Sequence, residues 1–206
     1  MFALVDKSDN SITKMLNGNR GITLNDLQYP RAIYTLWSEA ERNAIGIYTV
    51  EYDDSNKKDE KWYINTNQSY AFGSGKVTAT YGTATAKAHA DTTWTQEQID
   101  DGDAPDGADT DTVAVEGLKT RLIKTVKAQA EGELNRTDWY ITRKAEKNTA
   151  IPSAITTHRD AVRSKQAAME TAITNASDTP ALETLYAYTT DSDGVQSRPL
   201  GELPTL

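Results

Sequence analysis

The 206-residue sequence has no cysteine, which excludes disulfides and thiolate metal sites. Its two histidines, His89 and His158, lie about seventy residues apart, and neither has further ligands at the spacing of a zinc site. No apolar run approaches the ~20 residues of a membrane-spanning helix. The acid at Asp6 comes before any apolar run builds up, so we expect no signal peptide. We therefore predict no metal site, no cofactor and no membrane partner.

Basic and apolar residues are both scarce. Lys and Arg number 22 against 30 Asp and Glu, which gives a net charge of −8. This acidic balance repels phosphate backbones and argues against nucleic acid as a partner. Hydrophobic residues make up 37% of the chain, and the mean hydropathy is −0.64. A thin core is expected, and such domains depend on partners for stability, so we expect the partner to be another protein.

Motifs of catalysis are also missing. The sequence has no nucleophile elbow and no phosphate-binding loop, since Gly73-Ser74-Gly75 lacks the third glycine and the following helix. An EF-hand loop starting at Asp101 fails because Pro105 and Asp106 stand at its fifth and sixth positions. The paired carboxylates lie in polar stretches that are typical of exposed surface. We predict no catalytic residue and no enzymatic activity.

Strand patterns fill residues 1–99, which we expect to form an antiparallel, β-rich docking domain of an α+β protein. The turn residues Asn17-Gly18-Asn19 predict a hairpin that joins Ser11–Leu16 to Gly21–Leu24. Ser38 and Glu41 fit a capping box at the start of a short helix. Further strands are expected at Phe2–Val5, Ile47–Tyr52, Trp62–Asn65, Tyr70–Phe72 and Lys76–Tyr81.

An acidic stretch and a change of period follow. Residues 100–111 hold six acids, two glycines and a proline, and this composition predicts a linker. Residues 112–187 form a predicted helical domain, a hairpin or three-helix segment, and residues 188–206 a loop-like tail. Residues 118–187 hold eleven basic and eight acidic residues, so this part is mildly basic. The charge split favours self-association or electrostatic docking.

Apolar residues recur at helical spacing in two segments of the helical domain. This spacing places them on one face of each helix and predicts a narrow seam of the kind used for pairing with one other helix. The residues expected to pair are Leu118, Leu122, Val126, Ile155, Val162, Met169 and Ile173.

Aromatic usage is skewed, with four Trp and ten Tyr against two Phe. Trp and Tyr combine an apolar body with a polar tip and are favoured at protein interfaces. The same residues could belong to the core of a thin domain or stack on carbohydrate. The sequence leaves these three interpretations open.

Both halves of the sequence carry a resemblance to a known family. Thr137–Glu146 (TDWYITRKAE) is followed by Thr149-Ala150-Ile151-Pro152 and then by His158–Arg163 (HRDAVR). This order resembles the C-terminal motif of phage tail-fibre assembly and tail-attachment proteins, with His158 where that family has an aromatic residue. The N-terminal MFAL and the element from Trp37 to Val50 (WSEAE leading to GIYTV) resemble the same proteins more weakly.

The resemblance implies a non-enzymatic structural protein of a phage virion, placed at the tail, baseplate or fibre-attachment region and made in the cytoplasm of a bacterial host. Its expected partners are other tail or fibre proteins and further copies of itself. A fibre-assembly chaperone that leaves before maturation and a carbohydrate-binding receptor module are the alternatives. The motif residues expected to make the contacts are Trp139, Arg143, Glu146, Arg159 and Arg163.

Overall fold

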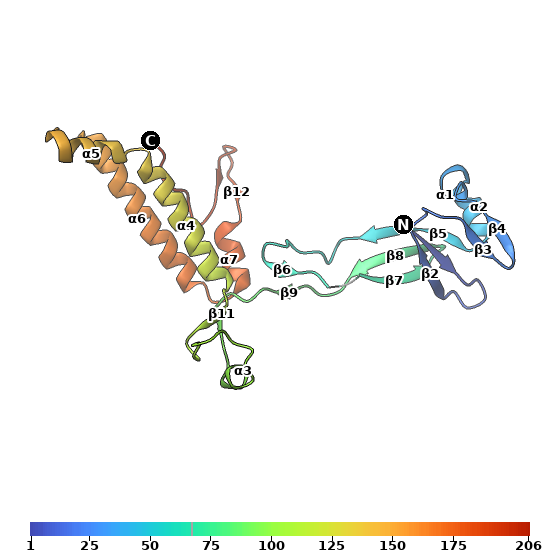
Figure 1. Ribbon diagram of the computed structural model, residues 1–206. Coiled ribbons are helices and arrows are strands. Elements are labelled where there is room, and N and C mark those ends of the chain that lie inside the picture. Colours follow the sequence, from blue (N-terminus) through green and yellow to red (C-terminus); the bar gives the residue numbers. More distant parts are fainter. Residues whose placement is uncertain (67) are drawn as a thin grey trace. The chain divides into compact units, whose positions relative to one another are not determined.

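The computed structural model describes residues 1–66 and 68–206 and divides into two compact units. We call Met1–Thr85 the N-terminal unit and Ala86–Leu206 the C-terminal unit. The main sheet lies in the first and the long helices lie in the second, which confirms the predicted α+β class (Figure 1).

A five-stranded sheet in the order β2-β1-β5-β8-β7 forms the centre of the N-terminal unit. Its strands are β1 (Phe2–Val5), β2 (Ile12–Leu16), β5 (Ile47–Asp53), β7 (Gln68–Gly73) and β8 (Lys76–Tyr81). The smaller elements are β3 (Ile22–Leu24), β4 (Leu27–Tyr29), α1 (Ile33–Leu36), α2 (Glu39–Ala44), β6 (Tyr63–Ile64) and, across the division, β9 (Thr85–Ala86).

The apolar residues of the sheet alternate between two clusters because successive side chains point to opposite faces. Ala3 and Val5 of β1 join Val50 and Val77 in one cluster. The flanking Phe2 and Leu4 pack with the second cluster, whose buried members are Leu16, Ile33, Tyr34 and Ile47. Helix α1 thus closes one side of the sheet. The predicted capping box of α2 is confirmed, with the Glu41 amide donating to Ser38 Oγ and the Ser38 amide donating to Glu41.

The predicted pairing of strands across Asn17–Asn19 was wrong. Asn17–Asn19 does not join a hairpin: β2 pairs with β1, and β3 pairs with β4. The tighter turn is Asn25-Asp26, whose positive φ values of 49° and 63° suit a two-residue hairpin.

The sheet is also mixed rather than antiparallel. Strand β5 runs parallel to β8, with Val50 opposite Val77. The turn at Ser74-Gly75, where φ is 52° and 76°, reverses the chain between β7 and β8, so β8 runs in the direction of β5.

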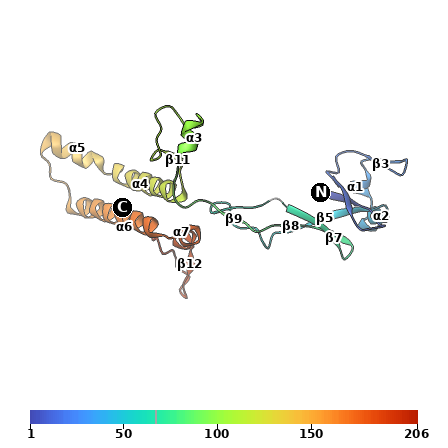
Figure 2. The ribbon, with the colours of Figure 1, turned by 90° about the horizontal axis from the view of Figure 1, so that it is seen from below.

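A pair of long helices dominates the C-terminal unit, with α4 and α6 side by side in Figures 1 and 2. The helices are α3 (Gln96–Asp100), α4 (Leu118–Asn135), α5 (Asp138–Lys147), α6 (Ser153–Asn175) and α7 (Thr179–Tyr186). The short strands are β10 (Thr92–Thr93), β11 (Val113–Val115), β12 (Thr189–Thr190) and β13 (Gln196–Ser197). Val115, within the predicted helical domain of residues 112–187, lies in β11. No helix in the described part of the chain is long and apolar enough to cross a membrane.

The acidic residues do not separate the two units. The division falls at Thr85/Ala86, whereas the sequence suggested a docking domain to residue 99 and a linker over 100–111. Strands β10 and β11 pair antiparallel on either side of the acidic stretch and make it a loop within the C-terminal unit. Residues 188–206, predicted as a loop-like tail, contain the short strands β12 and β13 and are anchored at Leu200. Leu200 is buried, and its amide donates to the Leu185 carbonyl at 3.0 Å.

Candidate interaction surface

The seam between α4 and α6 is filled within one chain. All seven residues expected to pair are buried there, with Val162 and Ile173 fully enclosed. Their spacing of three to four residues places them on the facing sides of the two helices. These side chains therefore hold the helix pair together and are covered by it, so the surface available to a partner lies elsewhere.

Arg159 is the buried centre of the resemblance motif. Arg159 is 7% exposed. Its Nη1 donates hydrogen bonds to the Leu134 carbonyl (2.8 Å), to Thr137 Oγ1 (2.7 Å) and to Asp138 Oδ1 (2.8 Å). Leu134 lies at the end of α4, where backbone carbonyls lack helical donors. The guanidinium thus fixes α6 to the junction between α4 and α5, so Arg159 positions these three helices.

Helix α5 carries the exposed part of the motif. None of its ten residues is buried, and Trp139 is 52% exposed. The guanidinium of Arg143 lies 4.7 Å from the Trp139 ring centre and 5.2 Å from that of Tyr140. This cation–π stack holds the long Arg143 side chain in one orientation. Its buried Nε has no hydrogen-bond partner among the described residues.

The remaining motif residues lie apart from this stack. Glu146 is exposed near the end of α5, and Arg163 is exposed on α6, where it pairs with Asp160 at 3.2 Å. The five residues that the sequence grouped as one contact motif are therefore distributed: one is buried, three lie on α5, and one borders a groove. The sequence grouped these five residues by their order along the motif. That order does not determine which of their side chains are buried and which are exposed.

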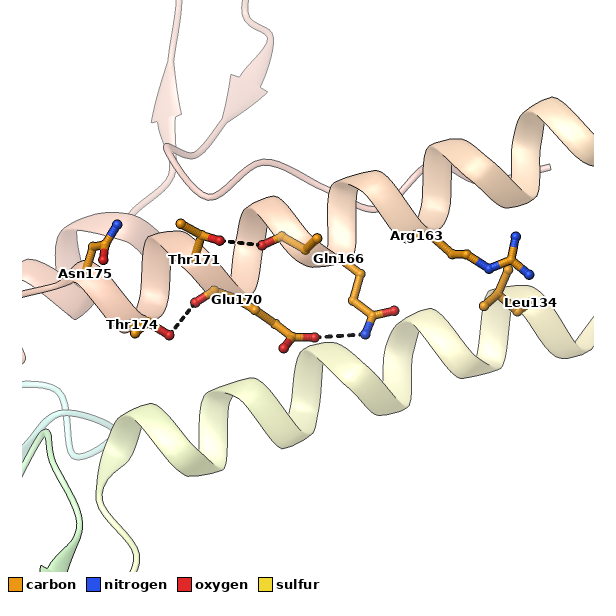
Figure 3. Close-up of a pocket in the computed structure, with 8 residues that line it drawn as sticks. Leu134, Arg163, Gln166, Glu170, Thr171, Thr174 and Asn175 are labelled. Atoms are coloured by element: carbon orange, nitrogen blue, oxygen red, sulfur yellow. Dashed lines mark hydrogen bonds between the residues drawn. The ribbon is translucent and has the colours of Figure 1, made fainter.

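The groove that Arg163 borders runs along α6 and has a volume of about 740 Å³ (Figure 3). Several of its polar groups bind neighbours within the unit. Gln166 donates to Glu170 at 2.8 Å, and the hydroxyl of Thr174 donates to the Glu170 carbonyl at 2.8 Å. Glu170 also pairs with Lys127 of α4 at 3.6 Å. The groove is lined by Leu134, Arg163, Gln166, Ala167, Glu170, Thr171, Thr174 and Asn175.

The N-terminus of α4 is capped from a distance, by residues that the sequence did not single out. Gly117, at the N-cap position, has no side chain to accept a hydrogen bond. Its amide donates instead to Asp91 Oδ1 at 2.7 Å, and the Thr120 hydroxyl donates to Asp91 Oδ2 at 2.8 Å. The next two amides donate to the carbonyls of Ala88 and His89. Residues 88–91 therefore serve as the cap, and we call them the latch segment.

The hydrogen bonds from Gly117 and Thr120 lower the pKa of the Asp91 carboxyl below its ordinary value. A lowered pKa in the folded state stabilises the fold above the ordinary pKa of Asp, about 3.9, and this contribution is lost as the pH falls through the folded value. We expect Asp91→Asn to make unfolding of the C-terminal unit less dependent on pH between about pH 5 and 3. Urea titrations at a series of pH values check this. An unchanged pH profile would contradict the cap.

Close contact between the latch segment and Gly117 predicts a second effect. A Cβ on Gly117 would collide with the backbone of Ala90. We expect Gly117→Ala to destabilise the C-terminal unit by about 1–3 kcal/mol, because the latch backbone must shift. Gly132→Ala is the matched control. Gly132 lies within α4 with open space around it, so alanine there should stabilise by up to about 1 kcal/mol. Urea unfolding measures both.

Neither histidine belongs to a cluster with chemistry. Nε2 of His158 is buried on α6 without a hydrogen-bond partner in the described part of the chain. Within residues 1–66 and 68–206, no group of three His, Asp or Glu side chains is placed to hold a metal ion. No protein-family model, no curated protein sequence and no solved structure matches this chain.

Proposed function

We propose that the chain is a non-enzymatic structural protein of a tailed-phage virion, acting as an adaptor in the tail, baseplate or fibre-attachment region. The observation that carries this proposal is that two separately compact units each expose large apolar side chains. In the N-terminal unit Leu36 is 79% exposed, and Leu27 and Ile64 are also exposed. In the C-terminal unit Trp139 and Ile141 of α5 are exposed.

Apolar side chains on a surface are stabilised when a partner covers them. Two such surfaces on two units suit a protein that joins two neighbours. The order of Thr137–Glu146, Pro152 and His158–Arg163 supports a phage lineage, since it resembles the motif of tail-fibre assembly and attachment proteins. An adaptor of this kind remains in the particle, with other tail or fibre proteins and further copies of the chain as its neighbours.

Mass spectrometry of purified particles tests the proposal. Virions from the phage that encodes the chain would be washed in high salt, digested and quantified against a known tail protein. We expect peptides from both units at a fixed ratio to that protein. Peptides that occur only in the lysate, in a soluble complex with a fibre protein, would replace the adaptor with an assembly chaperone. Their absence from both samples would overturn both functions.

A second measurement addresses the two surfaces directly. Chemical cross-linking of the particles, followed by mass spectrometry, should join lysines of the N-terminal unit and lysines of α5 to different neighbours. Lys7 and Lys14 report on the first unit, and Lys144 and Lys147 on the second. Cross-links from both units to one and the same protein would contradict the adaptor arrangement.

A further inference from the structure

Residues 97–111, which we call the acidic segment, concentrate negative charge in a folded loop. The segment holds seven carboxylates and no basic residue. Its fold is defined locally: Thr95 and Gln98 form the capping box of α3, and the Thr112 hydroxyl donates to Asp109 at 2.7 Å. None of the seven carboxylates forms an ion pair with a residue that the structure describes. The repulsion among them is therefore not offset within the chain.

One side of α5 has the opposite character. At about 100° per residue, Arg143, Lys144 and Lys147 fall within an arc of about 100° around Tyr140, and the acids Asp138 and Glu146 fall outside it. We call these three cations the basic face. None of the three forms an ion pair within the described residues. The stack on Trp139 and Tyr140 holds the Arg143 guanidinium in place, which lowers the entropy lost when it meets a carboxylate.

The two groups cannot meet within one chain. The acidic segment is anchored by β10 and β11 just before the N-terminus of α4, and α5 begins just after its C-terminus. The 18 residues of α4 separate them by about 27 Å. Figures 1 and 2 show α3 and α5 at opposite ends of α4. At physiological salt the Debye length is about 8 Å, so attraction over this distance is screened.

We propose that the basic face of α5 binds the acidic segment of a second copy of this chain, head to tail. Charge decides this orientation: two basic faces, or two acidic segments, repel when they are brought together. The contact is heterologous, because each copy offers two different surfaces, and it therefore generates a closed ring or an open row of subunits. The proposal concerns the purified chain and stands whether or not the protein is retained in a virion.

Sedimentation of the full-length protein at several concentrations and two salt concentrations tests the contact. We expect reversible self-association that weakens as salt rises. Lys144→Glu/Lys147→Glu should raise the dissociation constant by at least about tenfold, and so should Asp103→Lys/Asp106→Lys. Neither pair of side chains forms a hydrogen bond within the described residues, so both variants should keep the fold, as circular dichroism can verify. Lys14→Glu/Arg20→Glu, two exposed residues of the N-terminal unit, is the control with the same charge change and no expected effect.

Complementation identifies the contact. An equimolar mixture of the two variants should associate again, because the unchanged acidic segment of the first variant then meets the unchanged basic face of the second. A monomer at every salt concentration, salt-independent association, or variants that fail to complement each other would each overturn the proposal.

Discussion

Arg159→Ala is expected to destabilise the C-terminal unit by about 2–4 kcal/mol. The substitution removes a charged donor from the Leu134 carbonyl, Thr137 Oγ1 and Asp138, and a hydrogen bond to a charged group contributes about 1.5–3 kcal/mol. The aliphatic part of the buried side chain adds a packing loss. The ion pair with Asp138 contributes little, since that side chain is half exposed and its charge is screened. Urea unfolding followed by the helical circular dichroism signal measures the change.

Two variants separate the causes. Arg163→Ala removes an arginine one turn further along α6, where the side chain is exposed and pairs with Asp160, so we expect a change within about 0.5 kcal/mol. Arg159→Met restores most of the packed volume without the hydrogen bonds, so it should remain clearly less stable than the wild type. Wild-type stability in Arg159→Met would show that the clamp depends on packing alone.

Val162→Asp should unfold the C-terminal unit and leave the N-terminal unit folded. Val162 is fully buried between α4 and α6, and an ionised carboxylate without a partner at such a site costs more than a thin core provides. Hydrogen exchange measured on proteolytic peptides should show loss of protection across α4, α6 and α7. Peptides from β1, β5 and β8 should exchange as in the wild type.

Val77→Asp is the reciprocal variant. Val77 is fully buried in β8 of the five-stranded sheet, so its replacement should expose the amides of the N-terminal unit alone. The pair of experiments establishes whether each compact unit has an independent core. Loss of protection in both units from either substitution would mean that the chain folds as one cooperative body.

Local patterns predicted the features that depend on local physics. The spacing of Leu118, Leu122 and Val126 places them on one face of a helix whatever that helix packs against. The capping box needs only Ser38 and Glu41, three positions apart, and it forms as expected. Strand β5 follows from the alternation of β-branched and aromatic residues, which suits a half-buried sheet.

Features that join distant residues could not be read in this way. The cap from Asp91 to Gly117 crosses 26 positions, and no pattern in the sequence links the two. The burial of Arg159 depends on where α6 meets the end of α4, which its position beside an acid does not reveal. The parallel pairing of β5 with β8 depends on how the chain returns after Asp53.

Composition misdirected one boundary. A run of acids, glycine and proline is typical of a linker, yet the residues at its two ends pair as β10 and β11. That pairing joins Thr93 to Val113 and needs no contribution from the acidic side chains between them. The composition of a segment indicates how much apolar area it can bury. It does not indicate whether the residues on either side of the segment pair as strands.

The buried position of Leu200 has a consequence for the order of events during translation. The N-terminal unit has all its residues once Thr85 is added, whereas the C-terminal unit gains its last buried side chain only when Leu200 follows 115 residues later. At about 5–20 residues per second this interval is on the order of 10 s. The sheet of the N-terminal unit can thus fold on the ribosome before the C-terminal unit has its last buried residue.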